Sequence, residues 1–215
     1  MTMNNVKTDE ACPAALMSVS EFVTARTNPG TRITLRKKFC YTLHVLKLVL
    51  PNVKYMDSAR AAMKERCVNG EISKQDMQNE LALMADAKTY VQNILAKRKS
   101  AGQKSGHIPM TRYWLIDNEE YIGTLGLRHK VTKQTKDREG HVGYHIRPSK
   151  RNKGYGTEIL RLGLLKAKGL GLRTIYINCA KDNTASISII EKNGGILRKG
   201  ASTVDDSAHY IIKLV

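Results

Sequence analysis

The stretch RPSKRNKGYGTEILRLGLL, residues 147–165, decides the fold that the sequence predicts. Four basic residues and two glycines fall within its first ten positions, and apolar residues at helical spacing follow directly. The first turn of a helix has unpaired backbone N–H groups and a partly positive end, and glycine lets a ligand approach the backbone closely. The stretch therefore predicts an anion site in which Gly154 and Gly156 wrap N–H groups around a phosphate. The alternative is a basic, solvated turn that simply precedes a helix.

Length and charge limit the classes of protein that fit. A chain of 215 residues makes one ordinary domain, or one domain with an extension. The formal net charge of +17 permits nucleic acid, an acidic protein surface or a phosphorylated small molecule as partner. Phenylalanine occurs only twice and tryptophan once, so the aromatic residues of a nucleic-acid stacking platform are missing and nucleic acid is the weaker choice.

The cysteines and the N-terminal residues predict a cytoplasmic protein. Cys12, Cys40, Cys67 and Cys179 form no C-x-x-C pair and no metal-ligand spacing, which favours reduced thiols. Acidic residues precede the short apolar stretch near the N-terminus and a proline interrupts it, so we expect no signal peptide. No apolar run approaches the ~20 residues that a membrane span needs.

The rest of the chain divides into a poorly patterned extension, residues 1–43, and one domain, residues 44–215. Within the domain, apolar periodicity and turn residues predict alternating helices and strands. The expected strands are 46–50, 112–117, 120–129, 141–148, 172–180, 195–202 and 208–215, and the expected helices are 53–68, 73–100, 155–168 and 181–194. We expect Asn118 and Glu119 to form a tight hairpin turn, and residues 130–138 to form a basic loop.

This order of elements, with the glycine stretch between a strand and its helix, resembles the GNAT superfamily of acyl-CoA-dependent N-acyltransferases. The family motif [RQ]-x-x-G-x-[GA] matches residues 151–156, RNKGYG. A second family motif, N-x-x-[AS] followed by E-K-x-G-[FG], matches Asn183 to Ser186 and residues 191–195. The resemblance covers roughly residues 45 to 215, and the chain is most similar to bacterial predicted acetyltransferases of unassigned substrate.

The resemblance implies an α/β (α+β) fold with a mixed, mostly antiparallel central sheet and helices on both faces. It also implies acetyl-CoA as cosubstrate, with no metal. In the family, the pyrophosphate sits on the glycine loop and the pantetheine chain bonds to the exposed strand edge before it. Asn183 would bond the pantetheine arm, although asparagine also serves as a helix N-cap. The implied cofactor-binding set is Ile146, Arg147, Pro148, Arg151, Asn152, Lys153, Gly154, Tyr155, Gly156, Thr157, Asn183, Ser186 and Lys192.

The catalytic residues are less clear from the sequence. Many family members have a tyrosine just before E-K that protonates the leaving thiolate, and here that position is Ile190. An amine acceptor is mostly protonated at pH 7, so the reaction needs a general base. We expect the catalytic set to be His141, His145 and Tyr144, with His141 preferred as base because relatives hold a glutamate at its position.

The sequence thus predicts an N-acetyltransferase that moves an acetyl group from acetyl-CoA to a primary amine by direct attack in a ternary complex. Two alternatives stay open, a catalytically weak or inactive GNAT-fold protein that binds coenzyme A and a basic module associated with nucleic acid. The acceptor, whether small molecule or protein, is not identified by the motifs, and a homodimer is left open.

Overall fold

The computed structural model describes residues 18–27, 31–40, 46–99, 108–198 and 206–214. The chain divides into two units, residues 1–45 and residues 46–215. In the first unit, β1 (Ser18–Thr27) pairs antiparallel with β2 (Thr31–Cys40). The sequence pattern predicts no regular element in this unit. Threonine recurs in both segments, with valine in the first and Ile33 in the second, and β-branched residues favour strands.

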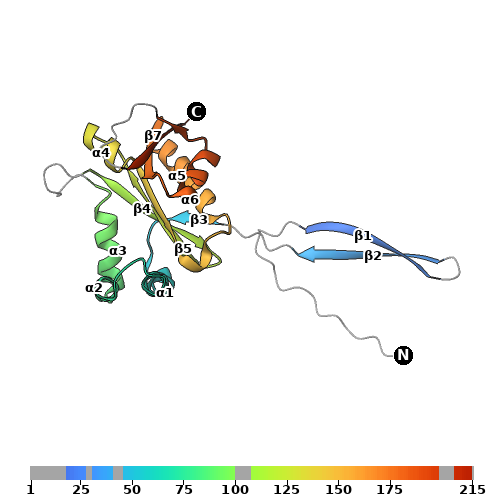
Figure 1. Ribbon diagram of the computed structural model, residues 1–215. Helices are drawn as coiled ribbons and strands as arrows, with labels where there is room; N and C mark the ends of the chain where they lie inside the picture. The colour runs from blue at the N-terminus through green and yellow to red at the C-terminus, as the bar shows by residue number, and fades with distance from the viewer. Residues whose placement is uncertain (1–17, 28–30, 41–45, 100–107, 199–205, 215) are drawn as a thin grey trace. The chain divides into compact units, whose positions relative to one another are not determined.

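The second unit contains two antiparallel sheets. The first has the strand order β3-β4-β5-β6 and the second has the order β7-β9-β8. Their bounds are β3 Lys47–Val49, β4 Met110–Asp117, β5 Glu120–Arg128, β6 Val142–Ile146, β7 Thr174–Ala180, β8 Ile196–Leu197 and β9 Ser207–Lys213. Every predicted strand of the domain is present, and the antiparallel pairing confirms the expected fold class (Figure 1).

The hairpin between β4 and β5 forms at the predicted position. Asn118 and Glu119 have φ angles of 43° and 65°, the left-handed region that two-residue hairpin turns of the primed type require. Farther along the pair the register shifts between Leu115 and Ile116, because Ile122 is an extra residue on β5. This bulge lies beside the end of β6, where Ile122 accepts a hydrogen bond from the Arg147 N–H.

Three helices cover one face of the first sheet, α1 (Met56–Val68), α2 (Lys74–Leu83) and α3 (Ala87–Ala96). A short helix, η1 (Val53–Tyr55), precedes α1. The prediction of one helix over 73–100 is wrong. The helix ends at Met84, and Asp86 starts a new one by accepting hydrogen bonds from the N–H groups of Lys88 and Thr89, both at 3.1 Å. The expected basic loop likewise contains a short helix, α4 (Lys133–Arg138).

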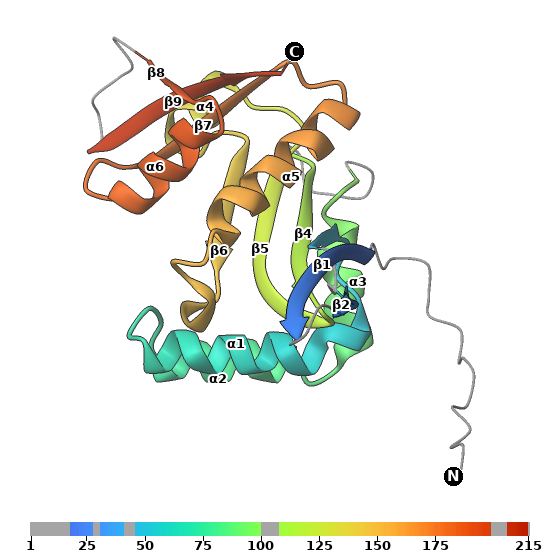
Figure 2. The same cartoon turned by 90° about the vertical axis from the view of Figure 1, so that its right-hand side faces the viewer.

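The opposite face packs against α5 (Tyr155–Gly169), and α6 (Thr184–Lys192) lies beside α5 (Figure 2). Side chains alternate between the faces along β4. Leu115 joins the core under α5, while Trp114 and Ile116 join the core under α1 and α3. Helices on both faces confirm the predicted architecture.

The two sheets meet at one end of β6 and β7. The His141 N–H donates to the Tyr176 carbonyl at 2.6 Å, and the Tyr176 N–H donates to His141 Nδ1 at 3.1 Å. Beyond this point the two strands belong to different sheets and diverge (Figure 2). Gly140 adopts a φ of +65° at the junction, and a Cβ there would lie 2.4 Å from the Tyr176 carbonyl oxygen. Only glycine therefore fits this contact.

We predict that Gly140→Ala lowers the free energy of unfolding by about 2 kcal/mol or more, because it combines left-handed strain with a backbone clash. Gly70→Ala is the matched control. Gly70 has a similar φ of +75°, but a Cβ there would meet nothing within 4 Å. The control should lose only about 1 kcal/mol. Urea unfolding of both variants checks this, and equal losses would argue against a close approach of the sheets at Gly140.

Candidate functional site

The glycine loop follows β6 through the short helix η2 (Pro148–Lys150). Asn152 and Gly154 have φ angles of 59° and 82°, so two left-handed residues turn the chain into α5. Gly154 is the N-cap of α5 and no side chain caps the helix there. A Cβ on Gly154 would meet nothing within 4 Å. The first N–H groups of α5 therefore begin beside open space, the arrangement that an anion at a helix start needs.

A cavity of about 330 Å³, here called the cofactor cavity, opens beside this loop. It lies between β6, the start of α5 and α6, and Gly156 allows α6 to come close, because a Cβ there would lie 2.5 Å from Ile189 Cδ1. The lining residues are Tyr144, His145, Ile146, Arg151, Asn152, Gly156, Asn183, Ala185, Ser186 and Ile189. The structure thus brings six of the thirteen predicted cofactor residues to one place, namely Ile146, Arg151, Asn152, Gly156, Asn183 and Ser186.

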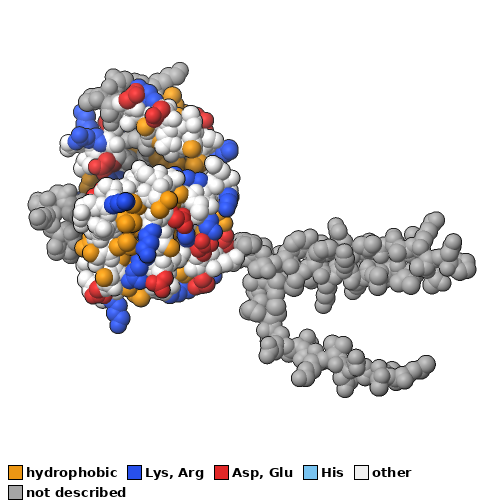
Figure 3. All heavy atoms as spheres, turned by 60° about the horizontal axis from the view of Figure 1, so that its bottom comes forward, with side chains coloured by type: hydrophobic (Ala, Val, Ile, Leu, Met, Phe, Trp, Pro, Cys, Tyr) orange, Lys and Arg blue, Asp and Glu red, His pale blue; other side chains and the backbone are white. Residues whose placement is uncertain are grey.

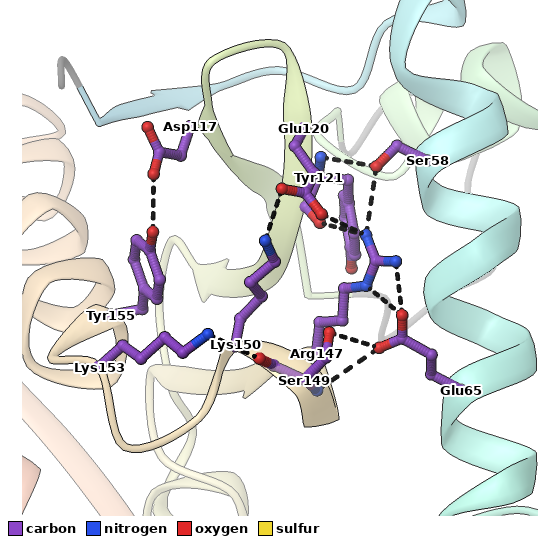
Figure 4. A network of polar contacts seen from close by, with 10 residues as sticks. All are labelled: Ser58, Glu65, Asp117, Glu120, Tyr121, Arg147, Ser149, Lys150, Lys153 and Tyr155. Atoms are coloured by element: carbon purple, nitrogen blue, oxygen red, sulfur yellow. Dashed lines mark hydrogen bonds and ion pairs between the residues drawn. The ribbon is translucent and has the colours of Figure 1, made fainter. Parts of the chain in front are cut away.

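Arg147, predicted in the cofactor set, is occupied elsewhere. Its side chain is 11% exposed, its Nε donates to Glu65 Oε1 at 2.8 Å, and its Nη1 donates to Glu120 Oε1 at 3.0 Å (Figure 4). The Arg147 hydrogen bond lowers the pKa of Glu65 and the Glu65 hydrogen bond raises the pKa of Arg147. Arg147 therefore ties α1 and the start of β5 to the strand end that precedes the loop.

Two other residues of the loop region also hold it to the first sheet. Lys150 Nζ contacts Glu120 Oε2 at 2.6 Å, and the Tyr155 hydroxyl donates to Asp117 Oδ2 at 2.6 Å (Figure 4). The Asp117 hydrogen bond raises the pKa of Tyr155 to about 12. Lys153 is exposed and its Nζ donates to the Ser149 carbonyl at 3.2 Å. Lys153 is therefore the loop cation without a carboxylate partner among the described residues.

A second cavity, of about 320 Å³, lies on the other face of the first sheet, under α1, α2 and α3. We call it the sheet–helix cavity. Its lining residues are Ala59, Ala62, Met63, Arg66, Ile72, Asp76, Glu80, Met84, Tyr90, Arg112, Trp114, Tyr121, Thr124 and His145. His145, at the end of β6, lines both cavities.

His145 is held by a carboxylate and a guanidinium. Its Nε2 lies 2.9 Å from Glu71 Oε2 and 3.0 Å from Arg151 Nη2, and Arg151 also pairs with Glu71 at 2.5 Å. Burial lowers the pKa of His145, against the opposing effect of Glu71. Burial alone would raise the pKa of Glu71, but hydrogen bonds from His145, Asn69 and Arg151 lower it to about 2. At neutral pH the ring is thus neutral beside an ionised carboxylate.

The other predicted catalytic residues differ in position. His141 is 4% exposed, its Nδ1 is used by the Tyr176 N–H, and its ring stacks on the Tyr176 ring. It lines neither cavity, and this position argues against the preference for His141 as base. Tyr144 lines the cofactor cavity together with Ser186, and its buried hydroxyl makes no hydrogen bond of ordinary geometry within the described residues. Burial raises the pKa of Tyr144.

The residues of α6 divide between capping and lining. Asn183 Oδ1 accepts the Ser186 N–H at 2.9 Å, the expected N-cap, and both residues line the cofactor cavity. Ile190, at the family tyrosine position, is fully buried in the core. Lys192 is exposed at the end of α6, and the Thr157 carbonyl accepts Asn193 Nδ2 at 3.2 Å. Neither Lys192 nor Thr157 lines the cavity.

Sequence reasoning missed the helical side of the site. Glu71, Arg112 and Trp114 were not singled out, because nothing in their local pattern separates a cavity residue from an ordinary surface or core residue. Within the described residues, no group of three or more His, Cys, Asp or Glu side chains could hold a metal ion. None of the helices in the same part of the chain is long and apolar enough to cross a membrane.

The basic charge is dispersed on the face shown in Figure 3. Lysine and arginine side chains there alternate with acidic and apolar ones, and no continuous basic surface runs across that face. Several of the basic residues are paired, among them Lys54 with Glu119 and Arg161 with Glu158.

A family model described as an acetyltransferase (GNAT) domain matches residues 56–196. A sequence search of curated proteins finds no match. Among solved structures, an acetyltransferase from Agrobacterium tumefaciens is similar, with 17% identity and a TM-score of 0.52 over 99% of this chain and 100% of that one. A microcin self-immunity acetyltransferase, MccE, in complex with acetyl-CoA and AMP, has 14% identity and a TM-score of 0.53 over 79% and 92%.

A third similar structure is the N-acetyltransferase PseH from Campylobacter jejuni in complex with acetyl coenzyme A. It has 13% identity and a TM-score of 0.50 over 80% of this chain and 100% of that one. At these identities the likeness shows the fold, so the roles of individual residues must come from the geometry of this chain.

We predict that Arg147→Gln lowers the free energy of unfolding by about 2 kcal/mol or more, because it leaves Glu65 and Glu120 without their partly buried partner. Arg161→Gln is the control, since Arg161 forms a more exposed ion pair with Glu158 on α5. The control should change the free energy by no more than about 0.5 kcal/mol. Thermal unfolding of both variants tests this; a stable Arg147→Gln protein would show that the ion pairs are dispensable.

Proposed function

Because the chain belongs to the GNAT acetyltransferase family, we propose that it transfers the acetyl group of acetyl-CoA to a primary amine by direct attack in a ternary complex. One observation carries this proposal. Two cavities, one beside the glycine loop and one beneath the helices, meet at His145. A donor and an acceptor held in the two cavities would come together at a titratable side chain.

The residues present fit coenzyme A. The uncapped start of α5, with left-handed Asn152 and Gly154, suits the pyrophosphate, and Lys153 can add positive charge. The Ile146 carbonyl on the diverging edge of β6 accepts Arg151 Nε at 3.1 Å, so this backbone group bonds to a side chain of the glycine loop and not to a neighbouring strand. When bound, the cofactor supplies the acetyl group as a reactive thioester.

His145 is the general base in this proposal. In the tautomer with hydrogen on Nε2, the ring donates to Glu71 Oε2, accepts no hydrogen bond from Arg151 Nη2, and keeps a lone pair on Nδ1 that can take a proton from the amine. The lowered pKa favours this neutral form at pH 7. Glu71 orients the ring, and Arg151 of the glycine loop fixes Glu71 in turn.

Tyr144 is the candidate proton donor to the leaving thiolate. Its orphaned hydroxyl lines the cofactor cavity, and its raised pKa keeps the proton in place at neutral pH. The tyrosine that Ile190 replaces is then not required. A thiolate with a pKa of about 8.5 also takes a proton from water without difficulty near neutral pH.

We also propose that the protein acts in the cytoplasm. The described cysteines, Cys67 and Cys179, are free thiols, as a reducing compartment would keep them. A homodimer stays a prediction, because the structure contains a single chain.

The proposal is tested with the full chain, acetyl-CoA and a panel of primary amines, by following the release of free thiol. Amine-dependent release above the rate of acetyl-CoA hydrolysis supports it. Binding of acetyl-CoA without any amine-dependent release would favour the alternative, a catalytically weak protein of the same fold.

We predict that Gly154→Val weakens acetyl-CoA binding at least about 10-fold, because a β-branched side chain disfavours the left-handed turn and blocks approach to the backbone. Gly171→Val is the matched control. Gly171 has a φ of +78° just after α5, also with nothing within 4 Å, but it lies outside the cofactor cavity. Calorimetry should show the loss for Gly154→Val alone. Unchanged affinity in a folded Gly154→Val protein would contradict the phosphate loop.

We predict that His145→Gln slows acetyl transfer by about 10²-fold or more, the usual effect of removing a positioned base. The wild-type rate should be on its plateau at pH 7 and fall only as the pH drops below 6.5, where the ring takes up a proton. This acidic limb should flatten in the variant. His129→Gln, outside both cavities, should keep the wild-type profile. A wild-type rate in His145→Gln, with loss of rate in His141→Gln, would restore His141.

A further inference from the structure

We propose that the sheet–helix cavity selects amines that carry an anionic group, a carboxylate or a phosphate, at the far end of a flat apolar body, and that Arg112 binds this anion. The inference rests on the proposed function, because it assigns the amine to the His145 end of the cavity. It identifies the acceptor as a small anionic amine.

The register of the sheet sets the relative positions of His145, Trp114 and Arg112. Trp114, Thr124 and His145 are directly paired across β4, β5 and β6, so they form one row on the face under the helices. Arg112 lies in the adjacent row, and its partners there are Gly126 and Gly143. The two glycines leave no side chain between Arg112 and the edge of the sheet at β6.

This arrangement separates the anion from the amine. Arg112 is on β4 and His145 is on β6, two interstrand spacings apart and one row apart along the strands, which together make about 12 Å at the backbone. An acceptor that reaches both groups holds its amine and its anion at opposite ends. Trp114 shares the row of His145 and stands two residues from Arg112 on β4, and its side chain lines the cavity.

Arg112 is the cation of the cavity whose hydrogen bonds are unused. Within the described residues its side chain makes no hydrogen bond and no ion pair, although the residue is half-buried. Arg66 also lines the cavity, and its buried Nε makes no hydrogen bond within the described residues, but its charge is paired with Glu71 Oε2 at 3.5 Å. A half-buried guanidinium without a partner binds carboxylate and phosphate groups well, because its N–H groups match their oxygens in pairs.

The acidic residues of the cavity already have donors. Glu80 Oε1 accepts the Tyr90 hydroxyl at 2.6 Å, and Asp76 Oδ2 accepts the Ser73 hydroxyl at 2.7 Å. These two carboxylates keep further acceptor positions on the α2 side of the cavity, so the anion of the acceptor is assigned to Arg112 on β4 and not to that side.

The rest of the wall is apolar and aromatic. Trp114 and Tyr121 meet edge to face with centroids 5.3 Å apart, and Met63 and Met84 complete the surface. Such walls bind flat apolar groups, and a volume of about 320 Å³ is at the small end of ligand sites. A single-ring amine fits this size.

Three probes with the same amine and ring test the inference. They are phenethylamine, 4-(2-aminoethyl)benzoate and 4-(2-aminoethyl)phenyl phosphate. Trp114 is the only tryptophan of the chain, so its fluorescence, excited at a wavelength that the probes do not absorb, reports binding in the presence of coenzyme A without any need for turnover. Thiol release from acetyl-CoA is measured in parallel.

We expect at least one anionic probe to bind about 10-fold more tightly than phenethylamine, the gain of a charge-assisted hydrogen bond. Arg112→Gln should abolish this preference, Arg112→Lys should retain part of it, and Arg161→Gln, on the other side of the sheet, should leave it intact. The benzoate and phosphate arms show which anion is preferred.

Equal binding of the three probes, no binding of either anionic probe, or an unchanged preference in a folded Arg112→Gln protein would overturn the inference. Anionic probes that bind through Arg112 without releasing thiol would instead count against the proposed acetyl transfer and leave the anion site standing.

Discussion

The separation of β6 from β7 is the constraint on which the site depends. The strands are joined at His141 and Tyr176, and from there each runs into its own sheet. A sheet edge exposes polar backbone groups that need partners. On β6 the Ile146 carbonyl receives Arg151, and the edge faces a cavity instead of another strand. A continuous sheet would fill the place where the cofactor cavity lies.

Keeping the end of β6 in place requires anchors, and these are electrostatic. Arg147 connects the strand end to Glu65 on α1 and to Glu120 on β5. Lys150 shares Glu120, and Tyr155 reaches Asp117 at the end of β4. Such contacts are shielded from water more than ordinary surface pairs, since the Arg147 side chain is 11% exposed. The basic residues that the sequence places before the helix thus serve largely to fasten the loop.

The sequence predicted the strands, the hairpin turn and the glycine loop because each has a local signature. Asn118 marks its turn by residue type, and Gly154 marks its loop by spacing. The break between α2 and α3 was missed, because apolar residues at helical spacing continue across Met84 and the cap at Asp86 is a single residue.

The choice between His141 and His145 could not come from the sequence. Both belong to the predicted strand 141–148 and lie four residues apart, so the pattern puts them on the same face. Only tertiary packing gives them different surroundings. The Tyr176 N–H donates to the ring of His141. Glu71, in the turn after α1, forms a hydrogen bond with the ring of His145. The lining of the sheet–helix cavity likewise depends on tertiary packing, since α1, α2 and β4 contribute to it from distant parts of the chain.

Because His145 lines both cavities, binding in one cavity affects the free energy of binding in the other. Arg151 belongs to the glycine loop, yet it bonds to Glu71, which bounds the opposite cavity. A ligand that orders the loop also orders this carboxylate and its histidine. The conformational free energy that is lost in ordering Glu71 and His145 when the first ligand binds is not lost again when the second ligand binds. Under the proposed function, linkage would make this effect reciprocal, so that donor and acceptor would each raise the affinity for the other.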